Sequence, residues 1–227
     1  MAMKNIIITG TSRGIGYELA LQLAHAGHHV IALSRKIPQG LLGNANITCL
    51  SVDLSKADDY LEIEKVLNAL GTKIDVLIHN AGSLVTKPFA QLTPTDFEKV
   101  YQVNVFAVAR LTQTVLPFLS QGSHVVTISS MGGIQGSMKF AGLAAYSSSK
   151  GAVITLSELL AEEYKEQGIA FNVLALGAVN TEMLQEAFPG YNAPTSPAEM
   201  AEYIAHFALT GNKYHNGKVI QVSSSTP

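Results

Sequence analysis

The chain opens with a strand, a glycine-rich turn and a helix in immediate succession. Residues 4–9 form an apolar, β-branched run typical of a buried parallel strand, and the segment GTSRGIG follows at residues 10–16. Leu19, Leu23 and Ala26 then recur at helical spacing. Glycine allows a tight turn and a close approach of the backbone to a ligand, and the free N–H groups of a helix N-terminus attract anions. This unit predicts a parallel α/β sheet whose first turn binds phosphate.

The glycine spacing leaves two interpretations of this turn. Residues 10–16 read Gly-x-x-x-Gly-x-Gly, whereas the commoner dinucleotide fingerprint is Gly-x-Gly-x-x-Gly. An ordinary turn between a strand and a helix is the alternative to a ligand site. The position of all three glycines between a buried strand and an amphipathic helix favours pyrophosphate binding.

Strand-like and helix-like segments alternate along the whole chain. Such alternation favours right-handed crossovers and a mostly parallel sheet covered by helices on both faces. A chain of 227 residues can form one α/β domain, and no Pro/Gly-rich linker divides it. We therefore expect a single domain over residues 1–227, a doubly wound (Rossmann) sheet of about seven strands with its ligand crevice beyond the carboxyl ends of the strands. The expected strands are residues 4–9, 29–34, 47–52, 75–79, 123–129, 169–175 and 218–222.

The composition argues against nucleic-acid and membrane partners. The chain has 15 basic and 17 acidic residues and a formal net charge of −2, so no overall field attracts a polyanion or an anionic membrane. No apolar run approaches the ~20 residues of a membrane span, and the amino terminus lacks the pattern of a signal peptide. The one cysteine, Cys49, lies in an apolar run and cannot form a disulfide framework. We expect a soluble, cytoplasmic protein.

A tyrosine and a lysine lie four residues apart in a segment predicted to be helical. Tyr146 and Lys150, in the sequence YSSSK, therefore share one helix face. A phenol titrates near ~10, and a neighbouring ammonium group lowers its pKa by favouring the phenolate. The pair resembles an acid/base tuned for neutral pH, although a solvated surface pair has the same spacing. The other motifs of the chain decide between these interpretations.

Taken together, the motifs resemble those of the short-chain dehydrogenase/reductase family, from Thr9 to about Val222. The matching segments are TGTSRGIG at 9–16, DL at 53–54, HNAG at 79–82, Asn104, ISS at 128–130, Tyr146 with Lys150, and NVLALGAVNT at 172–181. The resemblance implies a Rossmann fold, a nicotinamide dinucleotide cofactor, and hydride transfer between that cofactor and a carbonyl/alcohol pair.

The resemblance gives four residues a catalytic role. Ser130 would hydrogen-bond the substrate oxygen, and Tyr146 would give that oxygen a proton as hydride reaches the carbon. Lys150 would lower the pKa of the phenol and hold the nicotinamide ribose, and Asn104 would position a water molecule linking Lys150 to solvent. The alternative for Asn104 is a helix-interior side chain that bonds to backbone. Ser129 competes with Ser130, and the second serine is favoured because it lies further out of the strand.

Basic residues near the second strand indicate the form of the cofactor. An enzyme that prefers NAD(H) places a carboxylate there to accept hydrogen bonds from the adenosine ribose. This chain has Ser34 followed by Arg35. Arg35 and Arg13 can hold a 2′-phosphate through guanidinium hydrogen bonds, which predicts NADP(H) and leaves NAD(H) possible. The alternative is that both arginines are solvated loop charges.

The remaining cofactor contacts are implied by the resemblance. Asp53 and Leu54, expected to end the third strand, would meet the adenine, and residues 80–82 would meet the ribose unless they form a plain turn. Val179 and Thr181 would meet the nicotinamide carboxamide. No metal site is predicted. The complete expected cofactor set is Gly10, Ser12, Arg13, Ile15, Gly16, Ser34, Arg35, Asp53, Leu54, Asn80, Ala81, Gly82, Tyr146, Lys150, Val179 and Thr181.

Two positions depart from the family pattern. Leu176-Gly177 stands where Pro-Gly is usual, so the backbone there loses a fixed φ and regains an N–H group. His79 replaces an asparagine, and we expect a packed or hydrogen-bonded side chain at a strand end without a catalytic role.

The substrate is not identified by the sequence. Residues 131–145 supply apolar candidates for a substrate wall, with Lys139 as a lone polar candidate. The Pro/Gly-rich segment 188–197 predicts an irregular loop before a helix that begins near Ser196, and the resemblance implies that this loop is a short lid over the substrate. The carbonyl group can belong to a ketone, an aldehyde, an acyl thioester or a pterin. Apolar helices over 101–119 and 147–167 resemble those by which family members form homodimers and homotetramers. The apolar candidates are Met131, Ile134, Met138, Phe140 and Leu143.

The sequence thus favours an oxidoreductase that transfers hydride between NADP(H) and a small-molecule carbonyl or alcohol. An NAD(H)-linked alcohol dehydrogenase of the same family is the first alternative. A catalytically inactive dinucleotide-binding redox sensor is the second, but loss of the serine, tyrosine or lysine is expected of such a protein, and all three are present.

Overall fold

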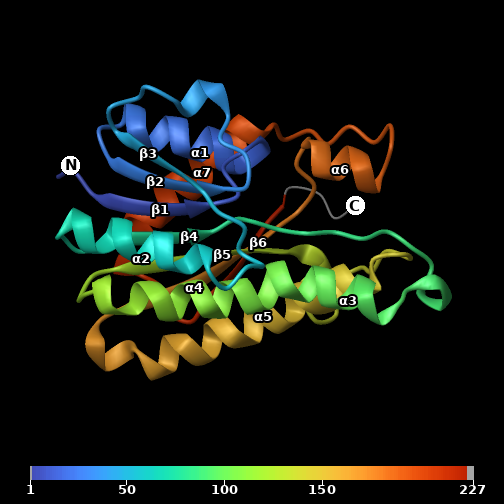
Figure 1. The fold of residues 1–227 in the computed structure, drawn as a ribbon. Helices are drawn as coiled ribbons and strands as arrows, with labels where there is room; N and C mark the ends of the chain where they lie inside the picture. Colours follow the sequence, from blue (N-terminus) through green and yellow to red (C-terminus); the bar gives the residue numbers. More distant parts are fainter. Residues whose placement is uncertain (1, 224–227) are drawn as a thin grey trace.

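Seven parallel strands form one sheet in the order β3-β2-β1-β4-β5-β6-β7, with helices on both faces (Figure 1). This computed structural model describes residues 2–223; residue 1 and residues 224–227 of the predicted domain lie outside the described residues. The predicted doubly wound fold is confirmed. The strands are β1 (Asn5–Thr9), β2 (His29–Ser34), β3 (Ile47–Ser51), β4 (Val76–His79), β5 (His124–Ser130), β6 (Ala170–Leu176) and β7 (Val219–Val222).

The continuous apolar run at the amino terminus forms β1 because its side chains enter two cores. Ile6 and Ile8 pack in one apolar cluster and Ile7 packs in the other, as the alternation of side chains along a strand requires. The first cluster contains residues of α1 (Gly14–His25) and α7 (Pro197–Thr210). The second contains residues of α2 (Asp59–Leu70), α4 (Ala107–Val115) and α5 (Ala144–Glu163). Both faces of the sheet are therefore covered, and a parallel sheet needs such cover.

Local capping defines where two helices begin. Thr93 accepts a hydrogen bond from the Asp96 backbone N–H before α3 (Pro94–Tyr101), and the Asp96 carboxylate accepts in return from the Thr93 backbone. Ser196 and Glu199 form the same reciprocal pair before α7. The helix predicted to begin near Ser196 is thus confirmed.

Other boundaries differ from the predicted ones. β3 ends at Ser51, so Asp53 and Leu54 lie in the loop after the strand rather than at its end. The helix predicted over 101–119 is divided into the end of α3, a π-helical turn at Gln102–Phe106, α4, and a 3-10 turn at Leu116–Phe118. Proline at position 117 has no N–H to continue α4. No helix within residues 2–223 is long and apolar enough to cross a bilayer.

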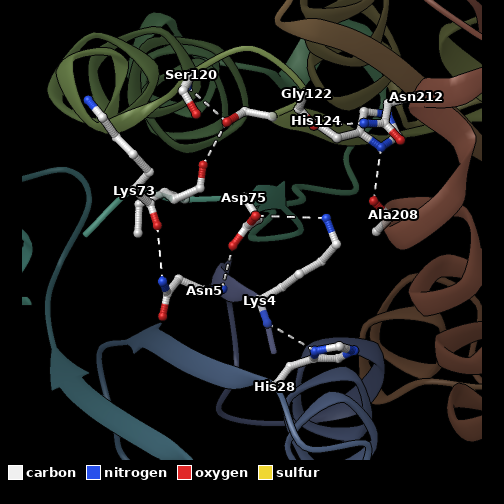
Figure 2. Close-up of polar contacts among 12 residues, drawn as sticks. Lys4, Asn5, His28, Lys73, Asp75, Ser120, Gly122, His124, Ala208 and Asn212 are labelled. Atoms are coloured by element: carbon white, nitrogen blue, oxygen red, sulfur yellow. Dashed lines mark hydrogen bonds and ion pairs between the residues drawn. The ribbon is translucent and has the colours of Figure 1, made fainter. Parts of the chain in front are cut away.

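Figure 2 shows polar contacts near the amino-terminal ends of β1, β4 and β5, the edge of the sheet opposite the crevice. The Asn5 backbone N–H donates to Asp75 Oδ2 at 2.8 Å, and Lys4 Nζ lies 3.8 Å from Asp75 Oδ1. His124 Nδ1 donates to the Ala208 carbonyl at 3.0 Å and so joins β5 to α7. These contacts join the amino-terminal ends of the strands to one another and to α7. The ligand crevice lies at the opposite edge, at the carboxyl-terminal ends of the strands.

Two buried histidines predict a loss of stability in acid. Burial lowers the pKa of His79 from 6.5 to about 3 and the pKa of His124 to about 4, although the bond to Ala208 partly opposes the second shift. Between about pH 6.5 and pH 4 the unfolded chain therefore binds more protons than the folded chain, so the free energy of unfolding falls as the pH falls. We expect a loss on the order of 2 kcal/mol per histidine between about pH 7.5 and pH 5.

Urea unfolding at the two pH values measures this loss. His79→Gln serves as the matched variant, because its amide keeps a donor toward Thr112 and does not titrate. The pH dependence of its unfolding free energy should be about half that of the wild type. An equal pH dependence in both proteins would show that the pKa of His79 does not change on folding.

Candidate active site

The glycine turn after β1 lies against the end of β4. Gly10 has a φ of +75°, and a Cβ atom there would lie 2.8 Å from Ala81 Cα. A Cβ atom on Gly16 would collide with the Gly10 carbonyl and with Asn80. Only glycine satisfies both positions, and the absence of side chains leaves the backbone open toward the crevice.

The helix that follows the turn offers free N–H groups. Arg13 is the N-cap of α1, and its side chain makes no capping hydrogen bond. The first N–H groups of a helix have no intrahelical partner, and an anion can satisfy them. Ser12, Ile15 and Gly16 line the cleft at this point. The turn therefore fits the pyrophosphate of a dinucleotide.

Thr9 joins the ends of β1 and β4. Its hydroxyl accepts from the backbone N–H groups of Asn80 and Ala81 at 3.0 and 2.9 Å. Asn80 Nδ2 donates in turn to the carbonyls of Thr9 and Gly10 at 3.0 and 3.3 Å. Asn80 thus holds the glycine turn, and Thr9 is a positioning residue that was not predicted. The position of Thr9 at the end of the first strand, directly before Gly10, could have indicated this role.

One cleft of about 750 Å³ brings together nearly all predicted site residues at the carboxyl ends of the strands. It is lined by every residue of the predicted cofactor set and by Ser130, Tyr146 and Lys150. Asn104 lies behind the wall, 2% exposed. A dinucleotide and a small substrate need such a continuous cleft.

The two serines at the end of β5 have different environments. Ser129 is buried, and its hydroxyl donates to the Lys150 carbonyl at 2.9 Å. Ser130 faces the cleft, accepts from the Gly132 N–H at 3.2 Å, and shares a hydrogen bond with Tyr146 that acts to lower the pKa of the phenol. This arrangement favours Ser130, because Ser129 is already engaged with the backbone of α5.

Burial is the main influence on the pKa of Tyr146 in this structure, and the predicted lowering of that pKa by Lys150 stays a prediction. Burial raises the pKa of Tyr146 above its usual 10, and only the bond to Ser130 opposes that shift. Lys150 Nζ instead donates to the Ile128 carbonyl at 2.8 Å and lies 5.8 Å from the centre of the Tyr146 ring. Burial lowers the pKa of Lys150 from 10.5 to about 8. The phenol therefore keeps its proton at neutral pH.

Asn104 connects the loop after β4 to helix α5. Its Oδ1 accepts from the Ser83 N–H at 2.7 Å, and its Nδ2 donates to the Ser83 carbonyl and to Ser149 Oγ, both at 2.9 Å. A Cβ atom on Gly82 would lie 3.8 Å from both Asn104 Oδ1 and Lys150 Nζ. The side chain thus bonds to backbone, as the alternative interpretation held, but to another segment rather than to its own helix. Positioning of a water by Asn104 stays a prediction.

Asn104→Ala should destabilise the protein. The change leaves the half-buried backbone N–H and carbonyl of Ser83 without their partners, and groups left unsatisfied cost up to about 1–3 kcal/mol each. We expect the free energy of unfolding to fall by about 2–4 kcal/mol in urea titrations. Ser149→Ala removes one of the three bonds and should cost about 1 kcal/mol. Equal losses in the two variants would contradict this role of Asn104.

The adenosine end of the cleft contains the predicted specificity residues. Ser34 donates to the Lys36 carbonyl at 2.8 Å, and no carboxylate occupies its position. Asp53 Oδ1 accepts from the N–H and the hydroxyl of Ser55 at 3.0 and 2.7 Å, and the hydroxyl bond is the main cause that lowers the pKa of Asp53. Arg13 forms an ion pair of 2.8 Å with Glu186. This ion pair was not predicted.

The departures from the family pattern are accommodated within the fold. His79 Nε2 donates to Thr112 Oγ1 at 2.9 Å in a buried position, which confirms the expected hydrogen-bonded strand end. Leu176 ends β6 and pairs with Ser130, so its backbone lies within the sheet. Its side chain is 6% exposed and packs in the first apolar cluster.

The substrate end of the cleft differs in part from the predicted wall. Met131, Phe140 and Leu143 line the cleft, but Ile134 does not, and Met138 is 56% exposed. Phe140 contacts Phe188 of the predicted lid with ring centres 5.7 Å apart. Residues that also line the cleft but were not predicted include Leu84, Ser147 and Met183.

Lys139 was predicted as a polar recognition residue, and the structure gives it a different role. Its ammonium group donates to the carbonyls of Gly132 and Ile134 at 2.9 and 2.6 Å and to Ser137 Oγ at 2.8 Å. Lys139 therefore stabilises its own loop and does not line the cleft.

Comparison with known proteins identifies the family. A family model described as short chain dehydrogenase matches residues 4–192. The chain is 31% identical over 242 residues to the 3-oxoacyl-(acyl-carrier-protein) reductase FabG of Thermotoga maritima, with 96% of each chain covered. The protein belongs to the short chain dehydrogenase family and is an oxidoreductase that uses a nicotinamide dinucleotide.

Solved structures agree with this assignment. An NADP complex of RhlG from Pseudomonas aeruginosa is 27% identical with a TM-score of 0.87, covering 100% of this chain and 97% of that chain. A 4-hydroxyisoleucine dehydrogenase complexed with NADH is 24% identical with a TM-score of 0.87, covering 98% of both chains, and shows the shared fold.

Proposed function

We propose that this protein is an NADP(H)-dependent reductase of a small-molecule carbonyl, with Tyr146 as the proton donor. The observation that carries the proposal is the convergence of Ser130, Tyr146 and Lys150 in the cleft that the glycine turn opens. Two hydroxyl groups that converge in one cleft can bind a single carbonyl oxygen.

The residues present fit a nicotinamide dinucleotide. The glycine turn and the uncapped start of α1 would hold the pyrophosphate, and Asp53 and Leu54 would lie beside the adenine. Lys150, Val179 and Thr181 would hold the nicotinamide end. When bound, the reduced dinucleotide supplies the hydride.

Proton transfer falls to Tyr146. Ser130 donates to the substrate oxygen and fixes its position, and the neighbouring phenol then gives its proton to the oxygen as negative charge develops there. The raised pKa of Tyr146 keeps this proton in place at neutral pH. Lys150 with a pKa of about 8 is mostly protonated there and stabilises the phenolate that forms. A phenol that holds its proton at neutral pH is the form that reduction of a carbonyl requires.

The substrate we propose is an uncharged carbonyl compound with an apolar portion. Phe140, Leu143 and Phe188 line the cleft near the tyrosine, and Lys139 is engaged elsewhere, so apolar contact dominates this end. The Thermotoga relative is named for reduction of a 3-oxoacyl group, which is a carbonyl of this kind.

Steady-state consumption of NADPH against a panel of ketones, aldehydes and acyl thioesters tests the proposal. We expect turnover with at least one apolar carbonyl and much weaker turnover with NADH. A direct measurement of NADPH binding accompanies the assay. Tight binding without turnover would favour the inactive sensor, and equal use of NADH would favour the NAD(H)-linked dehydrogenase.

A further inference from the structure

Helix α6 (Glu182–Ala187) brings a carboxylate to the predicted phosphate-binding arginine. Glu186 Oε1 lies 2.8 Å from Arg13 Nη2, and the two side chains are 59% and 49% exposed. Figure 1 places α6 beyond the carboxyl-terminal edge of the sheet, where the crevice opens. Glu186 and Arg13 both line the cleft.

The ion pair with Glu186 engages the Arg13 guanidinium, the group that would bind a 2′-phosphate. A phosphate and a carboxylate both accept from the guanidinium N–H groups, and two anions on one guanidinium also repel each other. Arg35 lies in the same cleft, so the phosphate has a second cationic partner while Arg13 is paired. Binding of the 2′-phosphate through Arg13 is therefore opposed by Glu186, which already accepts at Nη2.

We propose that Glu186 is a specificity-determining residue that competes with the 2′-phosphate for Arg13. The inference rests on the proposed function, since it assumes that Arg13 binds this phosphate. Glu186 reduces the advantage of NADPH over NADH, and its displacement releases one of the contacts that hold α6 over the cleft. A further contact of residues 182–188, between Phe188 and Phe140, lies toward the substrate.

A second carboxylate on α6 provides an internal control. Glu182 lies one helical turn before Glu186, and its Oε2 would be 3.6 Å from a Cβ atom on Gly14. It faces the pyrophosphate turn rather than the arginine head group. Removal of its charge should therefore change the binding of all phosphate-bearing ligands alike, whereas removal of the Glu186 charge should act on the 2′-phosphate alone.

Calorimetric binding of two probes to the whole protein tests the proposal. The probes are 2′,5′-ADP, which carries the 2′-phosphate, and 5′-AMP, which lacks it. An exposed ion pair is weak, so we expect Glu186→Gln to bind 2′,5′-ADP about two- to fivefold more tightly than the wild type, with 5′-AMP unchanged. Glu182→Gln should leave the ratio of the two affinities unchanged. In an Arg13→Gln background the Glu186→Gln effect should disappear, because its partner is gone.

The outcomes separate this inference from the proposed function. If Arg13→Gln weakens 2′,5′-ADP but Glu186→Gln leaves it unchanged, the competition by Glu186 is refuted and the phosphate site stands. If Glu186→Gln and Glu182→Gln change the affinities for both probes equally, the cause is a general change in the electrostatic potential of the cleft. The specific competition by Glu186 is then also refuted. If Arg13→Gln has no effect on 2′,5′-ADP, both the phosphate role of Arg13 and the inference fail.

Discussion

Tyr146→Phe is expected to lower kcat by ~10²–10⁴-fold, the usual contribution of a positioned proton donor. The change removes one hydroxyl, and the ring keeps its packing, so the fold and the affinity for NADPH should stay close to the wild type. Steady-state kinetics with an accepted carbonyl measure the rate, and fluorescence titration measures the affinity. Retention of more than about a tenth of the wild-type kcat would remove Tyr146 from the acid role.

Lys150→Ala is the control for this result, because Lys150 is predicted to contact both the phenol and the nicotinamide ribose. Its loss should weaken cofactor binding as well as the rate, whereas Tyr146→Phe should affect the rate alone. An unchanged affinity for NADPH in Lys150→Ala would contradict the ribose contact.

The second large effect concerns the choice of cofactor. A hydrogen bond to a charged group contributes about 1.5–3 kcal/mol, and every 1.4 kcal/mol is tenfold, so Arg13 and Arg35 together should favour NADPH by roughly ten- to a thousandfold. Solvent exposure and the pairing of Arg13 with Glu186 place the wild type toward the lower end of this range. The preference should weaken with added salt.

Replacement of Ser34 by Asp together with Arg35→Ala should reverse the preference. The new carboxylate repels a 2′-phosphate and accepts from a free ribose hydroxyl. The ratio of kcat/KM for the two cofactors, measured in the wild type and the double variant, gives the result. Equal values or a preference for NADH in the wild type would show that the two arginines are ordinary loop charges.

The fold followed from sequence patterns that depend on local physics. Apolar runs bounded by helical segments located all seven strands to within one residue at each end, because a strand covered on both faces must be continuously apolar. The division of the helix predicted over 101–119 was missed, since a π-helical turn around Asn104 leaves no distinct period in a short apolar segment.

Site residues could be predicted where the residue type and the sequence spacing determine the role. They could not be predicted where the role depends on contacts between residues far apart in the chain. Glycines at a strand end and a tyrosine four residues before a lysine are visible in the chain. The ion pair of Arg13 with Glu186 joins residues from different elements, and the three bonds of Lys139 arise from the path of its loop. The raised pKa of Tyr146 depends on burial, which the spacing to Lys150 does not determine.

The central claim is hydride transfer from NADPH to a carbonyl carbon at Tyr146. The most direct measurement uses NADPH deuterated at the transferable position of its nicotinamide ring, with an apolar carbonyl and mass spectrometry of the product. We expect the wild-type product to carry deuterium on the former carbonyl carbon and Tyr146→Phe to yield almost no labelled product. A product without deuterium, or equal labelling by the two proteins, would contradict the account.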